Sequence, residues 1–209
     1  MRREFISKRF SDWLRQVSNH WVMLSALVIF VLFIALVLPG QAAKADAIAG
    51  KTGTPDMSFY YSAGDLYHMA EVYGEQGRAA YVKARFTFDL VFPVVYTIFL
   101  STSISWIFIR TFKVDTRWQY ANLVPVLGML FDYLENLSAS LVMLRYPART
   151  IVIDTLAPVF TVIKWIFVNG SFVLLFVGVA VGIWQWRQKR GSKVPGMDAD
   201  QAALKLDEK

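Results

Sequence analysis

Three carboxylic acids interrupt stretches of this chain that are otherwise apolar. Asp132 and Glu135 lie within the sequence GMLFDYLEN, and Asp89 lies within RFTFDLVFPVV. A charge at the centre of a membrane-spanning helix raises the free energy of insertion by about 2.5–3.5 kcal/mol, so such residues usually pair with another group or serve a function. A carboxyl group in apolar surroundings can act as a general acid or stabilise a cation. These three acids are therefore the candidate catalytic residues.

Polar and small residues share one face of each of three apolar stretches when the stretches are placed on helices of about 100° per residue. They are Arg85, Asp89 and Tyr96 in one stretch, Asp132, Glu135 and Asn136 in the next, and Thr161, Lys164 and Ser171 in the last. Aromatic residues at the cytoplasmic ends of these helices mark one membrane boundary. The number of residues from this boundary to the three acids and to Lys164 places all four in the outer half of a membrane. We expect these faces to meet in one polar pocket.

The balance of charges in this pocket leaves two interpretations open. If the charges only hold the helices together, Lys164 neutralises Glu135 or Asp132, and Arg85 neutralises Asp89 four residues further on. One acid then has no base, and it must be protonated or meet a cation. In a ligand site, the same two bases would instead tune the acids.

A ligand site would also draw on polar side chains from the helices and from the loop that precedes Arg85. The expected ligand-binding residues are Asn136, Tyr96, Lys164, Arg85, His68, Glu71 and Tyr67. Asn136 and Tyr96 would orient the ligand, and residues 60–71 would form an aromatic lid. The triplet Asp65, His68 and Glu71 has the spacing of a metal or proton site, but a solvated helix face is the favoured interpretation, so no metal is predicted.

Composition places the chain among membrane proteins and excludes several classes of site. Of its 209 residues 56% are hydrophobic and 18% charged, which is less charge than the roughly 25% of soluble domains. The absence of cysteine excludes disulfides and cysteine-ligated metals, and no cofactor is expected. The net charge of +6 comes from residues beside the apolar stretches, and nucleotide motifs are missing, so no nucleic-acid partner is predicted.

Four apolar stretches predict an all-α, polytopic membrane protein: a four-transmembrane-helix bundle with an extracytoplasmic helical cap. The stretches are 21–38, 86–109, about 120–144, and 151–186, the last long enough to project from the membrane or to break near Pro158. The sequence AKADA after the first stretch resembles a signal-peptide cleavage site, but the apolar stretch is as long as a full span, and we expect a retained helix.

Basic residues beside the spans predict the topology. They are frequent in residues 1–20, between the second and third spans, and after the fourth span. Under the positive-inside rule both termini are then cytoplasmic. Residues 1–20 form either an amphipathic helix on an anionic leaflet or an ordinary charged leader, and the tail 187–209 is expected to be disordered.

The outer loop, residues 41–84 of the transmembrane domain 21–186, divides into two parts by composition. AAKADAIAGKTGTPD has the composition of a linker, whereas SAGDLYHMAEVYGEQGRAAYVKARF predicts a helix with a break at residues 74–77. The GxxxG pattern of Gly178 and Gly182 permits close helix packing, either inside one chain or in a homodimer.

Two stretches resemble a known group of four-span membrane proteins, the EXPERA group, which includes the sterol Δ8–Δ7 isomerase and the sigma-2 receptor. ARFTFDLVFPVVYTIFL is similar to the second span of that group, and LVPVLGMLFDYLEN is similar to its third. The resemblance implies a small lipid-like or sterol/isoprenoid-like ligand in the pocket, and isomerisation by proton transfer if there is a reaction. The buried Lys164 and the lack of an acid in the first span depart from the pattern of the group.

Two other classes of function remain open. The chain could be a non-catalytic membrane subunit or scaffold whose buried charges are structural. It could also be a small proton-coupled transporter, although four spans without an internal repeat would then need to dimerise.

Overall fold

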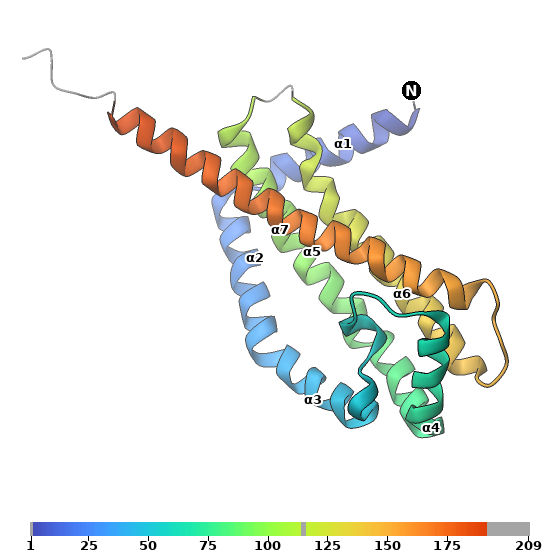
Figure 1. The fold of residues 1–209 in the computed structure, drawn as a ribbon. Helices are drawn as coiled ribbons and strands as arrows, with labels where there is room; N and C mark the ends of the chain where they lie inside the picture. The colour runs from blue at the N-terminus through green and yellow to red at the C-terminus, as the bar shows by residue number, and fades with distance from the viewer. Residues whose placement is uncertain (1, 114–115, 192–209) are drawn as a thin grey trace, which may run out of the picture.

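A computed structural model of the chain describes residues 2–113 and 116–191, and these residues form helices joined by short connections, with no strand among them (Figure 1). The prediction of an all-α protein is confirmed. Four helical segments are long and apolar enough to cross a membrane: His20–Ala49, Ala63–Thr111, Arg117–Arg145 and Ile153–Arg190. The predicted tail lies outside the described residues from position 192 onward.

The first long segment continues well beyond the apolar stretch that predicted it. Helix α2 (His20–Leu32) starts at Asn19, whose side chain accepts hydrogen bonds from two backbone amides of the first turn. A π-helical turn, η1 (Phe33–Val37), joins it to α3 (Leu38–Ala49). The interpretation of residues 42–49 as linker is therefore wrong. Pro39 lies in the first turn of α3, directly after the π-helical turn, and the helical path continues through it.

The helix predicted before the second span is present and breaks where expected. Helix α4 (Ala63–Arg85) begins with a capping box in which Ser62 and Asp65 satisfy each other's backbone amides. Gly74 adopts φ of 62°, a left-handed value that favours glycine, and it interrupts the helix. Helix α5 (Phe88–Thr111) follows after a short turn.

The last two long helices pack closely against each other. Helix α6 (Val124–Arg145) is preceded by the 3₁₀ segment η4 (Arg117–Leu123), and α7 (Ile153–Gly191) runs unbroken through Pro158. A Cβ on Gly128 would lie 3.1 Å from Val168 of α7, so this glycine sets the close approach of the two helices. In Figure 1, α7 crosses α5 and α6 obliquely.

The N-terminal segment forms helix α1 (Arg2–Val17), which lies against α5 and η4 at one end of the bundle. The hydroxyl of Ser11 donates to Asn122, whose side-chain amide donates to Ser11 O and Ser105 Oγ. The helix thus contacts the bundle through its small and polar face, and its apolar stripe is exposed. That stripe consists of Ile6, Phe10, Trp13 and Val17.

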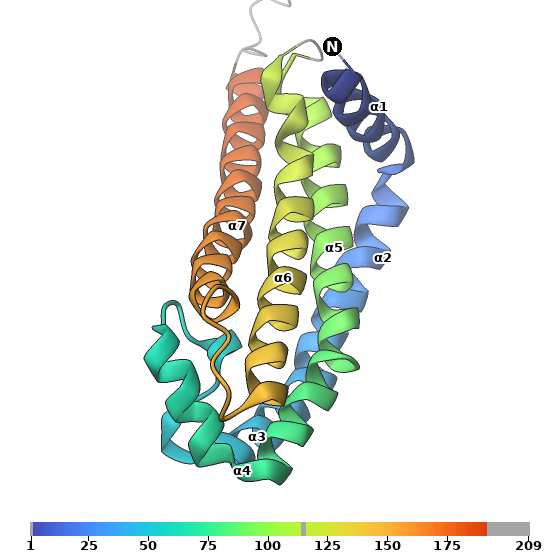
Figure 2. The same ribbon diagram turned by 90° about the vertical axis from the view of Figure 1, so that its right-hand side faces the viewer.

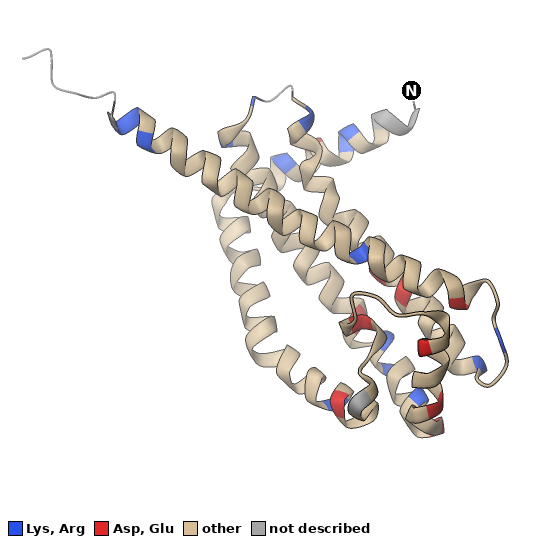
Figure 3. Ribbon diagram, viewed as in Figure 1, with Lys and Arg blue, Asp and Glu red and all other residues tan. Residues whose placement is uncertain are grey.

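We call this end of the bundle the α1 end and the opposite one the α4 end. The C-terminal end of α7 also lies at the α1 end, whereas α3 and α4 cover the α4 end (Figure 2). Charged residues separate accordingly: basic residues dominate at the α1 end, and acids gather near α4 and the adjoining parts of α5, α6 and α7 (Figure 3).

Candidate functional site

A buried ion pair joins α6 to α7 near the α4 end. Lys164 Nζ lies 2.5 Å from Glu135 Oε2, and their side chains are 5% and 1% exposed. Thr161, one turn before Lys164, donates a hydrogen bond of 2.7 Å to the other oxygen of Glu135. Between the two alternatives for Lys164, the structure selects Glu135. Both oxygens of this carboxylate are engaged, so the arrangement is that of a structural pair.

A second network surrounds Arg85, at the junction of α4 and α5. Its Nε lies 2.9 Å from Asp89 Oδ2, which confirms the predicted pair, and its NH1 lies 3.0 Å from Asp56 Oδ2. Asp56 belongs to η3 (Pro55–Met57), in the connection between α3 and α4. The guanidinium carbon also lies 4.7 Å from the ring centre of Tyr81. Two carboxylates and one aromatic ring therefore hold this guanidinium.

Asp56 lies outside the long apolar helices, and opposing effects act on its pKa. Burial raises the pKa, but the positive charges of Arg85 and Lys164 outweigh burial and hold the pKa below its ordinary value. Nearby, burial and the Glu135 carboxylate raise the pKa of Tyr61. The first residue is therefore an anion at neutral pH and the second a neutral phenol.

Asp132 is the predicted acid that has no base. Its carboxylate accepts hydrogen bonds of 3.2 Å from the hydroxyl of Tyr96 and from the side-chain amide of Asn136. No Lys, Arg or His of the described segments lies within ion-pair distance of it. The hydrogen-bond partners of this carboxylate among the described residues are therefore neutral donors.

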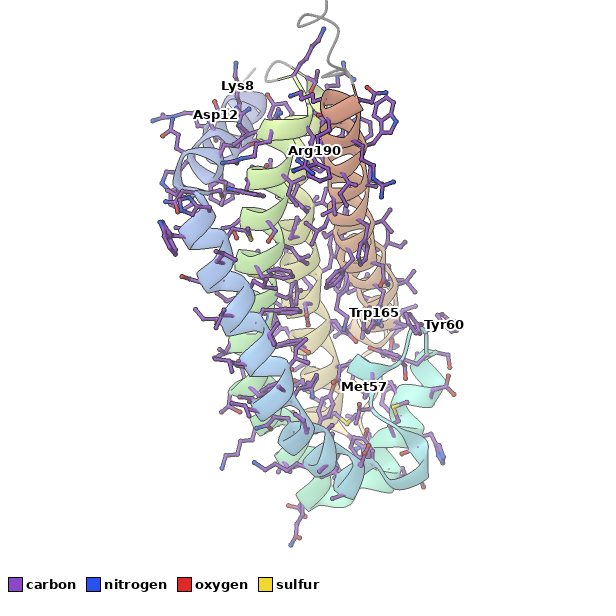
Figure 4. The ribbon with its side chains drawn as sticks, turned by 90° about the vertical axis from the view of Figure 1, so that its left-hand side faces the viewer. Lys8, Asp12, Met57, Tyr60, Trp165 and Arg190 are labelled. Atoms are coloured by element: carbon purple, nitrogen blue, oxygen red, sulfur yellow. The ribbon has the colours of Figure 1, made fainter. Side chains whose placement is uncertain are left out.

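The segment around η3 ties these networks to α7. Lys164 Nζ lies 3.5 Å from the carbonyl oxygen of Asp56, and the indole of Trp165 donates a 3.0 Å hydrogen bond to the carbonyl of Ser58. The rings of Phe59 and Trp165 are 5.0 Å apart. Figure 4 shows Trp165 beside the segment that carries Met57 and Tyr60. The predicted groups from α5, α6 and α7 thus gather at the α4 end, beside a segment that joins the end of the predicted linker to the start of the predicted lid.

A cavity of about 600 Å³ lies between α3, η3 and the second half of α4, and Asp56 and Arg85 both line it. We call it the outer cavity. Its apolar wall includes Leu38, Ala42, Ala45, Ile48, Met57 and Phe88. Its polar wall includes Thr54, Asp56, Tyr73, Tyr81 and Arg85, and Lys44, Asp46 and Lys83 also line it. Of the predicted ligand-binding residues, Arg85 lines the outer cavity, whereas Asn136, Tyr96 and Lys164 do not. The predicted catalytic residues Asp132 and Glu135 do not line it either.

The three residues predicted from the lid lie apart from both networks. His68 and Glu71 are exposed on α4, and Tyr67 is buried, accepting a 2.8 Å hydrogen bond from the amide of Thr150. No group of three potential metal ligands forms within the described part of the chain. Tyr67 therefore fastens α4 to the connection between α6 and α7.

Sequence reasoning missed Asp56 and Thr54, which form the polar wall of the outer cavity. They lie in the stretch GTPD, where no helical period relates them to the spans.

Comparison of the chain with protein families, with curated proteins and with solved structures gave no match. Its function must therefore be argued from the geometry of the site.

Proposed function

We propose that this chain is a four-span membrane protein that binds a small lipid-like molecule in the outer cavity. Both termini then lie in the cytoplasm, and the α4 end faces outward. The observation that carries the proposal is the outer cavity itself, an apolar space bounded on one side by the Asp56–Arg85 ion pair. The resemblance to the EXPERA group agrees with a sterol-like or isoprenoid-like ligand.

The size and lining of the cavity suit such a ligand. Its volume of about 600 Å³ lies within the roughly 300–1,000 Å³ of small-molecule sites, which combine apolar walls with a few polar groups. Burial of apolar surface is worth about 25 cal/mol per Å², so the apolar wall supplies most of the affinity.

The position of the cavity gives a lipid-like molecule a route from the membrane. Leu38 follows the most apolar part of the first span, and Phe88 begins α5, and both residues line the cavity. The cavity therefore adjoins the level at which the apolar helices end. A molecule dissolved in the outer leaflet can enter it without crossing the full width of the membrane.

None of the candidate catalytic residues Asp89, Asp132 and Glu135 lines the outer cavity. Glu135 is held by Lys164 and Thr161, whereas Asp132 has only neutral donors. Because Asp132 does not line the outer cavity, the proposal stops at binding.

The alternative, a scaffold whose charges are structural, is favoured by one observation: the Glu135–Lys164 pair is fully buried and satisfied. The two functions are compatible, since the pair and the cavity are separate. They differ in what they predict for the cavity.

Filling the outer cavity tests the proposal. Ala45 lines the cavity, and Ala43 on the same helix is exposed and does not line it. The full chain, purified in mild detergent, is expected to retain a lipid-like molecule that native mass spectrometry detects. Ala45→Phe should lose this molecule, and Ala43→Phe should keep it. Equal retention by all three proteins would show that the molecule adheres elsewhere, and the cavity would then have no binding role.

A further inference from the structure

Asn169 is an exposed polar residue within a long apolar stretch of α7. Apart from this residue and Ser171, residues 166–183 are all apolar or glycine. Ser171 is buried, and its hydroxyl donates a hydrogen bond to Phe167 O. The carboxamide of Asn169, in contrast, has no hydrogen-bond partner within the described segments of the chain.

The position of Asn169 along α7 lies within the hydrocarbon in the four-span arrangement proposed above. Trp165 and Trp184 stand at the two ends of the apolar stretch, and aromatic residues of this kind are enriched at membrane boundaries. Their separation corresponds to about 28 Å of helix, which matches the roughly 30 Å of a hydrocarbon slab. Asn169 is about 6 Å along the helix axis from Trp165 and about 22 Å from Trp184. Hydrocarbon therefore surrounds its amide wherever protein does not cover it.

An amide group in hydrocarbon needs a partner. Lipid tails offer neither a donor nor an acceptor, so an unpaired amide raises the free energy of the protein there. Asparagine in a membrane span commonly forms its hydrogen bonds to a neighbouring helix. Since Asn169 is exposed and unpaired within the described segments, its partner belongs to another molecule.

A second copy of this chain supplies the matching group. A carboxamide has two donor positions on Nδ2 and an acceptor in Oδ1. Two copies inserted in the same direction present their α7 helices in parallel, so a twofold axis brings one Asn169 opposite the other. Each Nδ2 then donates to the Oδ1 of the other copy, and both amides are satisfied without any further group.

The face of α7 around Asn169 has the form of a helix–helix seam. Exposed residues recur at alternating spacings of three and four, as they do along the contact of two parallel helices. They are Ile166, Asn169, Val173, Phe176, Ala180 and Ile183. A Cβ on Gly170 would meet no atom within 4 Å, so a second helix can approach closely beside Asn169. The helix lies at the edge of the bundle, with this face uncovered (Figure 2).

The first span is covered as little as α7, but it offers no comparable group. The exposed polar residue in the middle of α2 is Ser25. A serine hydroxyl can donate to a carbonyl of its own helix, whereas the carboxamide of Asn169 leaves several hydrogen-bonding positions to satisfy. Of these two uncovered helices, α7 is therefore the one that requires a partner.

We propose that the chain forms a parallel homodimer through this face of α7, with the two Asn169 carboxamides hydrogen-bonded to each other across the twofold axis. The inference rests on the four-span arrangement proposed above and is independent of the ligand of the outer cavity. The dimer does not use Gly178 and Gly182, because these glycines pack against α5 within the chain.

Cross-linking at two adjacent positions tests the face. The chain has no cysteine of its own, so Ala180→Cys and Val179→Cys each carry a single thiol. Both positions are exposed on α7 at almost the same depth, but they point about 100° apart. Oxidation of the full chain in liposomes of high lipid content should convert Ala180→Cys into a disulfide-linked dimer and leave Val179→Cys monomeric. Equal cross-linking of both, or no cross-linking of Ala180→Cys, would overturn the proposal.

Substitution of Asn169 tests the role of its amide. Asn169→Leu removes the amide, whereas Asn169→Gln keeps a carboxamide, and neither breaks a hydrogen bond within the described segments. Energy transfer between fluorescently labelled copies, measured as the liposomes are diluted with lipid, gives the dissociation constant of the dimer. It should rise at least about threefold in Asn169→Leu and stay within about twofold of the parent value in Asn169→Gln. A dissociation constant that Asn169→Leu leaves unchanged would refute the role of the amide.

The outcomes separate this inference from the proposed function. Ala45→Phe should leave the dimer intact, since Ala45 lies on α3. If the dimer forms as stated but Ala45→Phe still retains the lipid-like molecule, the ligand function alone is wrong. If the parent chain is monomeric but Ala45→Phe loses that molecule, the dimer alone is wrong. Labelling of Asn169→Cys by a membrane-impermeant maleimide would show that this position lies in water, and the dimer would then be wrong together with the placement of α7 in the membrane.

Discussion

Single residues in the buried networks differ in what their charge does. Glu135 and Lys164 neutralise each other, and removal of one would leave the other charged in an apolar environment. Asp132 has no such dependent partner, because its neighbours Tyr96 and Asn136 are neutral. Two carboxyl groups three residues apart on α6 therefore have different roles.

Matched amide substitutions test this difference. Glu135→Gln should lower the free energy of unfolding by about 3–5 kcal/mol, because it leaves the ammonium of Lys164 without its counter-charge. Asp132→Asn should change it by less than about 1 kcal/mol, since an amide can still accept the bond from Tyr96. Unfolding in detergent, followed by tryptophan fluorescence and denaturant titration, measures both. The double variant Glu135→Leu/Lys164→Met should recover most of the loss, and equal effects of the two amide variants would contradict the assignment.

The sequence predicted these residues better than it predicted their partners. Helical spacing indicated that Glu135, Lys164, Arg85 and Asp89 share one region, because spans of regular helix fix direction and depth. It could not select Glu135 over Asp132 for Lys164, since both lie on the same face of α6. The contact of Asp56 with Arg85 could not be predicted, because Asp56 lies in a connection whose path depends on the tertiary structure.

At the scale of helices, close packing depends on a few glycines. A Cβ on Gly178 would lie 2.7 Å from the ring of Phe108 on α5, and one on Gly182 would lie 3.2 Å from Thr111. The two glycines of the GxxxG pattern thus pack against α5 within the chain. This is one of the two alternatives that the sequence left open. A homodimer through these glycines stays a prediction, to which this packing lends no support.

Substitution of these glycines tests the packing of α7. Gly178→Ala should lower the free energy of unfolding by about 1–3 kcal/mol through overpacking against Phe108. Gly170→Ala, on the same helix, has no atom within 4 Å of the added Cβ. It should be neutral or stabilise by up to about 1 kcal/mol, as alanine is the better helix former. Thermal unfolding of both variants in one detergent measures this, and a stable Gly178→Ala protein would show that α5 and α7 lie further apart.

Helix boundaries were predictable where local signals coincide with packing. The break at Gly74 needed a residue that tolerates positive φ, and the sequence offers glycine there. The continuation of α2 into α3 was missed because Pro39-Gly40 usually ends a helix, whereas here the proline lies in the first turn of the next one. Pro158 also leaves α7 unbroken, for it lies near the start of the helix.

For the whole molecule, the distribution of charge fixes the proposed orientation. The α1 end carries mainly basic residues, whereas the α4 end carries acids together with basic residues. Positive charge next to membrane spans is retained in the cytoplasm. We therefore propose that the α4 end, with the outer cavity, faces away from the cytoplasm.

Labelling of single cysteines tests this orientation without interference, because the chain has no cysteine of its own. Gln76 is exposed near the α4 end and Gln188 near the C-terminal end of α7. In intact cells a membrane-impermeant maleimide should label Gln76→Cys, and it should label Gln188→Cys only after permeabilisation. The reverse pattern would show that the molecule is inverted.

The unbroken course of α7 has a mechanical consequence. With 39 residues the helix is roughly 58 Å long. Trp165, in its first half, donates a hydrogen bond to Ser58 O, and Gln185, near its C-terminal end, donates one to Thr111 O. A stiff rod of this length turns a small rotation into a large displacement: a tilt of about 5° moves one tip by roughly 5 Å relative to the other. If a shift of the η3 segment, which adjoins the outer cavity, tilts α7, the C-terminal end of this helix moves at the α1 end of the bundle.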